Sequence, residues 1–144
     1  PLTAWHDRCF LDARARQDLS RHPLAAIGGH TTSHAALATL DETSARDELA
    51  DNRNYLENLL QLPVRHLAYP YGAHGMREEH LADEVGYVSA VTTRHAQLGD
   101  HQPNQFALPR IGVCSSFDSE TSFAARMSGV QSAVLTLGAR LGRV

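Results

Sequence analysis

The sequence predicts a single α/β domain with a mostly parallel sheet, either open or closed into a barrel. Short apolar runs alternate with stretches of helical periodicity along the 144 residues, and only short connections separate them. Neither an internal repeat nor a low-complexity linker divides the chain, so residues 1–144 are expected to form one domain. In folds of this class, functional side chains lie on loops at the carboxyl ends of the strands.

The first half of the chain predicts two helices and one strand. Residues 8–22 have a helical pattern that Pro23 stops, and the apolar run 24–27 predicts a strand that two glycines end. A second helix is expected over residues 41–62, because acidic side chains at its start favour the positive end of the helix dipole. Its apolar positions repeat about every 3.6 residues: Ala45, Leu49, Leu56, Leu59 and Leu60.

The second half continues the alternation. Residues 66–69 predict a strand, 76–85 a helix that ends at a glycine, and 87–91 and 111–113 two further strands. A terminal amphipathic helix is expected over residues 119–142. Its apolar side chains are spaced by four and three residues, which is typical of the buried face of a helix: Phe123, Met127, Val130, Val134, Leu137 and Leu141.

The composition excludes several function classes. A net charge of -3 and a pI near 6.3 argue against a basic surface that binds nucleic acid, and no apolar run approaches the length of a membrane span. Cys9 and Cys114 form no Cys-x-x-Cys pair, so neither a disulfide framework nor a cysteine zinc site is indicated. The first residue is Pro1, and we expect a fragment of a longer protein.

Two histidines follow the first predicted strand, four residues apart in IGGHTTSH (residues 27–34). Imidazoles at this spacing can bind one metal ion; zinc is the first choice for nitrogen ligands, although histidine also suits other divalent metals. A catalytic site would need a third protein ligand and an open position for water. The alternative is that His30 and His34 are solvated loop residues in a chain that has nine histidines.

A sharp turn follows the next predicted strand at AYPYG (residues 68–72). Tyr69 and Tyr71 are candidates for aromatic walls around a sugar ring, and the Tyr71 backbone N–H is a candidate oxyanion donor. The alternative is an ordinary proline–glycine turn with packed aromatic side chains. Arg110 adjoins a further predicted strand, so three unusual groups are expected on one rim of the sheet.

These motifs resemble one known family. HTTSH (residues 30–34) resembles the His-Ser/Thr-x-x-His motif of the polysaccharide deacetylases, the NodB-like carbohydrate esterases of family 4. HLAYPYG (residues 66–72) resembles the FAYPYG form of the next motif in that family, and FALPRIGV (residues 106–113) also resembles this group. The resemblance covers roughly residues 2–113, and the order and spacing of the motifs make it specific.

The resemblance implies a distorted (β/α) barrel and a divalent metal ion held by an aspartate and two histidines. The two histidines would be His30 and His34. It also implies that the Thr31 hydroxyl stabilises the loop and that Tyr71 lends its backbone N–H to the oxyanion. The implied reaction is the hydrolytic removal of N- or O-acetyl groups from carbohydrate.

Parts of the family pattern are missing. The Thr-Phe-Asp-Asp run that supplies the catalytic base and the metal aspartate has no match, and the chain contains no Asp-Asp pair. Ala68 replaces the arginine of the family, and Arg110 is a candidate either to orient a carboxylate instead or to form a surface salt bridge. For the general acid of the Leu-x-His motif, neither His95 nor His101 is distinguished by its context.

We therefore expect a partial deacetylase barrel without its N-terminal strands. The intact domain would use Zn²⁺ or another divalent metal to remove acetyl groups from an amino sugar in a polysaccharide or glycoconjugate. The isolated chain is expected to be almost inactive, and to associate with itself or with the missing segment. The alternatives are a non-catalytic glycan-binding or assembly scaffold and a hydrolase of small amides. Family habit suggests a periplasmic or secreted location, without excluding the cytoplasm.

Overall fold

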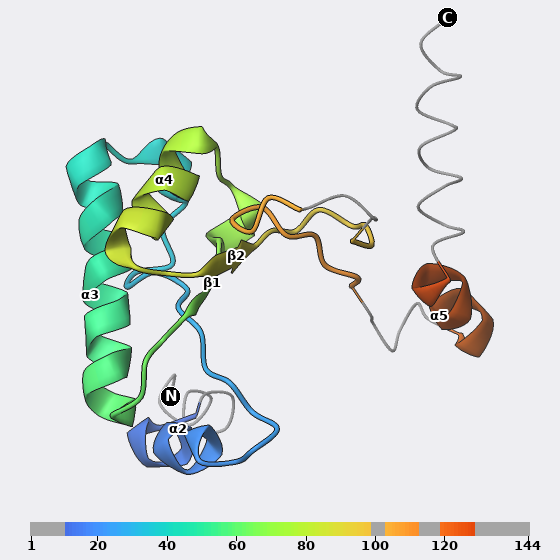
Figure 1. Ribbon diagram of the computed structural model, residues 1–144, viewed down its shortest axis with the longest axis horizontal. Helices are drawn as coiled ribbons and strands as arrows, with labels where there is room; N and C mark the ends of the chain where they lie inside the picture. The colour runs from blue at the N-terminus through green and yellow to red at the C-terminus, as the bar shows by residue number, and fades with distance from the viewer. Residues whose placement is uncertain (1–10, 99–102, 113–118, 129–144) are drawn as a thin grey trace, which may run out of the picture.

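The computed structural model describes residues 11–98, 103–112 and 119–128. Figure 1 shows α3 and α4 side by side on one side of the strands, with α2 near the C-terminal end of α3 and α5 on the opposite side. In chain order the elements are α2 (Ala13–Ser20), the short 3-10 helix η1 (Leu37–Thr39), α3 (Glu42–Leu60), β1 (His66–Ala68), the 3-10 helix η2 (Pro70–Gly72), α4 (Met76–Val85), β2 (Ser89–Val91) and α5 (Glu120–Met127).

The sheet is parallel, as the alternation of elements predicts. β1 pairs with β2, and Leu67 lies opposite Ala90. A single parallel bridge extends the sheet on each side, from Gly29 to Leu67 and from Val91 to Leu108. Four chain segments therefore run in one direction, and α3 and α4 form the crossovers between three of them. This arrangement confirms the predicted α/β class.

The predicted helices are present where the structure describes the chain, although α2 is shorter than the expected range 8–22, because the Asp12 side chain caps its start. The Asp41 carboxylate caps α3 by accepting the Ser44 N–H at 3.0 Å, and hydrogen bonds from Ser44 hold the pKa of Asp41 below its ordinary value. α4 ends at Gly86, whose φ of 97° suits only glycine. Of the predicted terminal helix, α5 lies within the described residues, whereas residues 129–142 lie outside them.

Two strand predictions were wrong. Residues 24–27 form no strand: Leu24 is 91% exposed, and pairing with β1 begins only at Gly29. The structure assigns no strand at residues 111–112 either, because the edge of the sheet pairs earlier, at Leu108. An apolar run alone does not reveal which of its residues reaches a partner strand.

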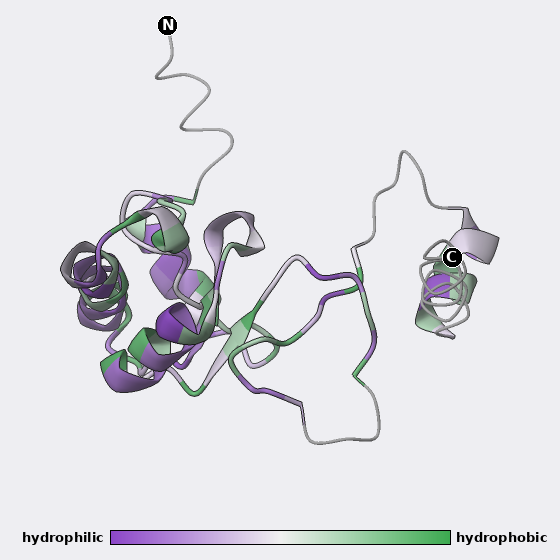
Figure 2. Cartoon of the chain, turned by 90° about the horizontal axis from the view of Figure 1, so that it is seen from above, coloured by the Kyte–Doolittle hydropathy of each residue, from purple (hydrophilic) through white to green (hydrophobic). Residues whose placement is uncertain are grey.

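One hydrophobic core joins the helices to the strands. The apolar face that the sequence predicts on α3 is buried there, together with side chains from α4 and both strands. Figure 2 shows hydrophilic as well as hydrophobic residues on the helices, as is typical of amphipathic helices that cover a sheet. The buried apolar residues are Leu37, Ala45, Leu49, Leu56, Leu60, Val64, Leu67, Tyr69, Leu81, Ala82, Tyr87, Ala90 and Phe106.

No helix within the described residues is long and apolar enough to cross a membrane.

The core predicts a clear contrast between two leucines. Leu49→Ala on α3 should lower the free energy of unfolding by about 2–5 kcal/mol, because a fully buried side chain is lost and a cavity remains. Leu24→Ala is the matched control at an exposed position and should change it by no more than about 0.5 kcal/mol. Urea unfolding of both variants measures the difference, and equal costs would contradict the packing of α3 on the core.

Candidate functional site

The loop that follows Gly29 brings the two candidate metal histidines together. The ring centroids of His30 and His34 lie 4.7 Å apart, with the planes nearly perpendicular. The Tyr71 ring packs edge-on against His34, with centroids 4.9 Å apart. Three residues that the sequence selects from two separate motifs thus form one contiguous cluster at the carboxyl ends of the parallel segments.

The backbone of this cluster adopts an unfavourable conformation. Thr31, His34 and Tyr71 have φ angles of 62°, 62° and 60°, in the left-handed region that side chains usually avoid. Apart from these three, only Gln61 among the described non-glycine residues shares this conformation. Each such residue costs on the order of 1–3 kcal/mol and persists only where surrounding contacts hold it. The loop and the turn are therefore held by their neighbours.

The carbonyl group of Ala68 fixes the His30 ring. His30 Nδ1 lies 2.6 Å from the Ala68 carbonyl oxygen, at the end of β1. Because a carbonyl oxygen only accepts hydrogen bonds, Nδ1 must carry the proton and donate it. The lone pair of the neutral ring then resides on Nε2, the nitrogen left free to bind a metal.

Two side chains of α3 hold the backbone of the loop, and the sequence motifs did not identify them. The Glu48 carboxylate accepts the N–H groups of Thr32 and Ser33 at 2.8 and 2.9 Å and the Ser33 hydroxyl at 2.6 Å. Asn52 Oδ1 accepts the His30 N–H at 3.0 Å. Burial raises the pKa of Glu48, but the hydrogen bonds from Ser33 and Thr32 outweigh it and keep this pKa below its ordinary value.

Thr31 is buried, and its hydroxyl has no hydrogen-bond partner among the described residues. Ser33, not Thr31, donates its hydroxyl to the Glu48 carboxylate, at 2.6 Å. The loop-stabilising role expected of Thr31 stays a prediction.

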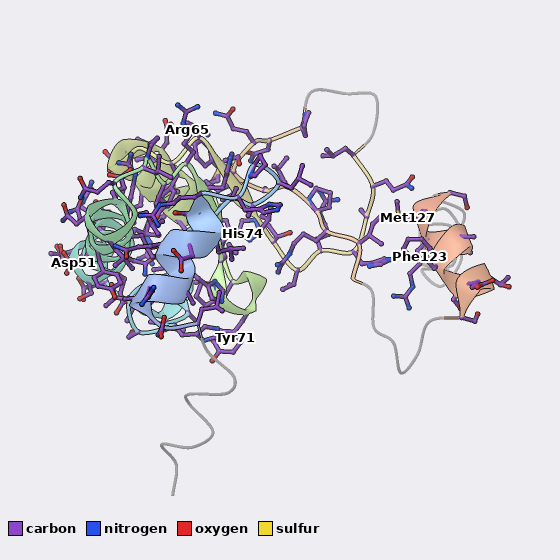
Figure 3. The ribbon with its side chains drawn as sticks, turned by 90° about the horizontal axis from the view of Figure 1, so that it is seen from below. Asp51, Arg65, Tyr71, His74, Phe123 and Met127 are labelled. Carbon is purple, nitrogen blue, oxygen red and sulfur yellow. The ribbon has the colours of Figure 1, made fainter. Side chains whose placement is uncertain are left out.

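The AYPYG turn exposes one tyrosine and its backbone. The Tyr71 side chain is 70% exposed and lies at the edge of the molecule in Figure 3. The turn is closed by hydrogen bonds from the N–H groups of Gly72 and Ala73, and within the described residues no acceptor takes the Tyr71 N–H. The Thr93 hydroxyl donates to the Tyr71 carbonyl at 3.3 Å, and a Cβ at Gly72 would overlap Thr93. These contacts fix the turn and leave the Tyr71 N–H able to donate a hydrogen bond to another group.

Tyr69 has a different environment from the one expected. Its side chain is fully buried and stacks on His74, with ring centroids 5.0 Å apart, so it belongs to the core and not to a surface wall. Burial, then the carboxylates of Glu79 and Glu78, raise the pKa of its hydroxyl far above the ordinary value. This corrects the expectation that Tyr69 faces a sugar ring.

Arg110 lies on the same rim and bonds to backbone. Its Nε donates to the Thr92 carbonyl oxygen at 2.6 Å, in the segment that also contacts Tyr71 through Thr93. Within the described residues it pairs with no carboxylate, so neither the predicted orienting role nor a surface salt bridge is seen there.

Other histidines that the structure describes have their own partners or face solvent. His66 and His80 are exposed. His74 is half-buried: it stacks on Tyr69, lies close to Glu79, and its Nδ1 bonds to the Gly72 carbonyl group at 2.9 Å. His95 is half-buried and accepts the Gly112 N–H, and His6 and His101 lie outside the described residues.

A hollow beside the loop carries acidic side chains. Its volume is about 290 Å³, and Asp51, labelled in Figure 3, lies on its α3 wall. Across residues 11–98, 103–112 and 119–128, no group of three or more His, Cys, Asp or Glu side chains is arranged to hold a metal ion. The residues that line the hollow are Thr32, Leu40, Ser44, Asp47, Glu48 and Asp51.

A family model described as polysaccharide deacetylase matches residues 14–90, which is more than half of the chain. The chain belongs to the polysaccharide deacetylase family. The matched range of this deacetylase-family chain contains His30, His34 and Tyr71, and it ends before Arg110. The comparison with curated proteins gave no match.

Solved structures of other deacetylases share the fold. The deacetylase PplD of Streptococcus pyogenes, solved in complex with acetate, gives a TM-score of 0.73 at 21% identity, over 88% of this chain and 54% of that one. A polysaccharide deacetylase from Bacillus cereus gives 0.71 at 20% identity, over 81% and 36%. The chain thus spans about half or less of the length of these proteins, and the described residues form part of the family's barrel.

The geometry around Ala68 predicts the tautomer of His30. In the neutral ring, the proton should reside on Nδ1, because the adjacent carbonyl group can only accept it. Long-range ¹H–¹⁵N correlation spectra at about pH 9, above the ordinary imidazole range, would report this tautomer. His66 serves as the control, since its Nδ1 faces the Ser89 hydroxyl, which can donate or accept. A proton on Nε2 of His30 would contradict the geometry.

Proposed function

We propose that this chain carries the two metal-binding histidines of a metal-dependent carbohydrate deacetylase. The enzyme would hydrolyse acetyl groups from an amino sugar in a polysaccharide or glycoconjugate. The observation that carries the proposal is the convergence of His30 and His34, whose centroids lie 4.7 Å apart beside Tyr71. Membership of the polysaccharide deacetylase family supports a carbohydrate substrate.

The donor atoms of the loop fit a divalent ion that prefers nitrogen ligands. His30 presents a free Nε2 lone pair because its Nδ1 is bonded to Ala68, and His34 packs against the same ring. Zn²⁺ is the proposed ion, with a carboxylate or water completing its ligands. When bound, such an ion polarises an acetyl carbonyl group and lowers the pKa of a bound water molecule.

Tyr71 would supply two groups to the substrate. Its backbone N–H, free among the described residues, can donate to the oxygen that becomes negative in a tetrahedral intermediate. Its exposed ring beside His34 offers an aromatic surface to a sugar. Arg110 would orient a carboxylate through its terminal nitrogens, because its Nε is already bonded to Thr92.

The first prediction from this proposal concerns zinc. Titration of the purified chain with Zn²⁺ by calorimetry should show one site, and both His30→Ala and His34→Ala should abolish it. His80→Ala is the matched control, because His80 lies on the exposed side of α4 and pairs with Glu84. Undiminished binding in both loop variants would refute the metal role of the pair.

The second prediction concerns turnover by the isolated chain. With Zn²⁺ present, it should release almost no acetate from N-acetylglucosamine oligosaccharides, because no Asp-Asp pair supplies a base and a third ligand. An acetate-release assay measures this, with His30→Ala as the baseline. Turnover that disappears in His30→Ala would overturn the expected inactivity. Glycan binding without any zinc binding would instead favour the non-catalytic scaffold.

A further inference from the structure

One face of α3 binds the histidine loop at two points. Glu48 and Asn52 are four residues apart, so their side chains lie one above the other on the helix. Together they accept three backbone N–H groups of the loop, those of His30, Thr32 and Ser33. The Ser33 hydroxyl adds a fourth hydrogen bond, to Glu48 Oε1 at 2.6 Å.

These contacts act at one candidate metal ligand, His30, and at the residue directly before the other, His34. Asn52 holds the backbone of His30 itself, and Glu48 holds Ser33, the residue directly before His34. Thr31, between the two anchored positions, and His34 have φ angles of 62°. Without outside acceptors, the loop would relax towards favoured conformations and the two rings would separate.

We propose that Glu48 and Asn52 are positioning residues that hold the His30 and His34 rings at the spacing a metal ion requires. The proposal rests on the proposed function of the two histidines. Preorganised ligands bind metal more tightly because the cost of ordering the loop is met before the ion arrives. Residues that orient metal ligands typically change metal affinity by about 10–100-fold when they are removed.

The length of the Glu48 side chain, more than its charge, should determine how firmly the loop is held. Two carboxylate oxygens serve three donors, with Oε2 facing both N–H groups and Oε1 facing the Ser33 hydroxyl. A glutamine can keep this pattern, because its amide oxygen accepts the N–H groups and its NH₂ donates to the hydroxyl oxygen. An aspartate keeps the charge but ends one methylene group short of the loop.

The test compares five single substitutions in the full 144-residue chain. Glu48→Ala and Asn52→Ala remove the anchors, Glu48→Gln keeps the reach, and Glu48→Asp keeps the charge. Asp47→Ala, at the neighbouring position on α3, removes one negative charge beside the same hollow, and no hydrogen bond joins Asp47 to the loop among the described residues. Circular dichroism checks that each variant is folded.

Two readouts separate this proposal from the zinc proposal. Amide hydrogen exchange at residues 30, 32 and 33 in the metal-free chain should become about tenfold faster in Glu48→Ala at residues 32 and 33, and in Asn52→Ala at residue 30. Zn²⁺ dissociation constants should rise about 10–100-fold in both variants. Glu48→Asp should show the same losses, whereas Glu48→Gln and Asp47→Ala should stay near the parent.

Three results would overturn the positioning role of Glu48 and Asn52. Parent-like exchange in Glu48→Ala and Asn52→Ala, or equal effects in Asp47→Ala, would overturn the positioning role. Faster exchange with unchanged zinc affinity would also overturn it, because the anchors would then stabilise the loop without placing the ligands. If Glu48→Ala does not fold, Glu48→Asp and Asn52→Ala decide. If the parent binds no zinc, the proposed metal site fails, whereas exchange still tests whether the anchors hold the loop.

Discussion

The close approach of Gly29 to β1 is the constraint on which the site depends. Its N–H donates to the strand at 2.8 Å, and its carbonyl oxygen accepts the Ala68 N–H at 2.9 Å. A Cβ at Gly29 would overlap the Tyr87 hydroxyl and crowd Asn52, so no larger residue fits there. This pairing fixes where the chain leaves the sheet, and it places His30 against the carbonyl group of Ala68.

The sequence predicts the helices well because their signals are local. The cap at Asp41, the apolar period of α3 and the glycine after α4 all act within a few residues. The strands depend on partners far away in the chain. The run at residues 24–27 is apolar enough for a strand, but on this side β1 is bridged at Gly29 instead, which no local pattern reveals.

The candidate site also contains some residues that local sequence patterns identify and others that only tertiary contacts identify. Spacing and position after an apolar run and two glycines select His30 and His34, whereas Glu48 is an ordinary helix carboxylate until the loop folds against it. Tyr69 and Tyr71 would share a face in a continuous strand. The left-handed backbone at Tyr71 breaks that alternation, which sends one ring into the core and the other to the surface. Tertiary contact decides both cases.

The left-handed backbone at Thr31 orders the histidine loop but costs folding stability. Replacing Thr31 with glycine would relieve backbone strain at φ 62° and remove a buried hydroxyl that has no partner among the described residues. The same replacement would widen the range of conformations open to the histidines on either side. Under the proposed metal role, selection for a more heat-stable chain would favour changes at residue 31 that selection for metal affinity rejects.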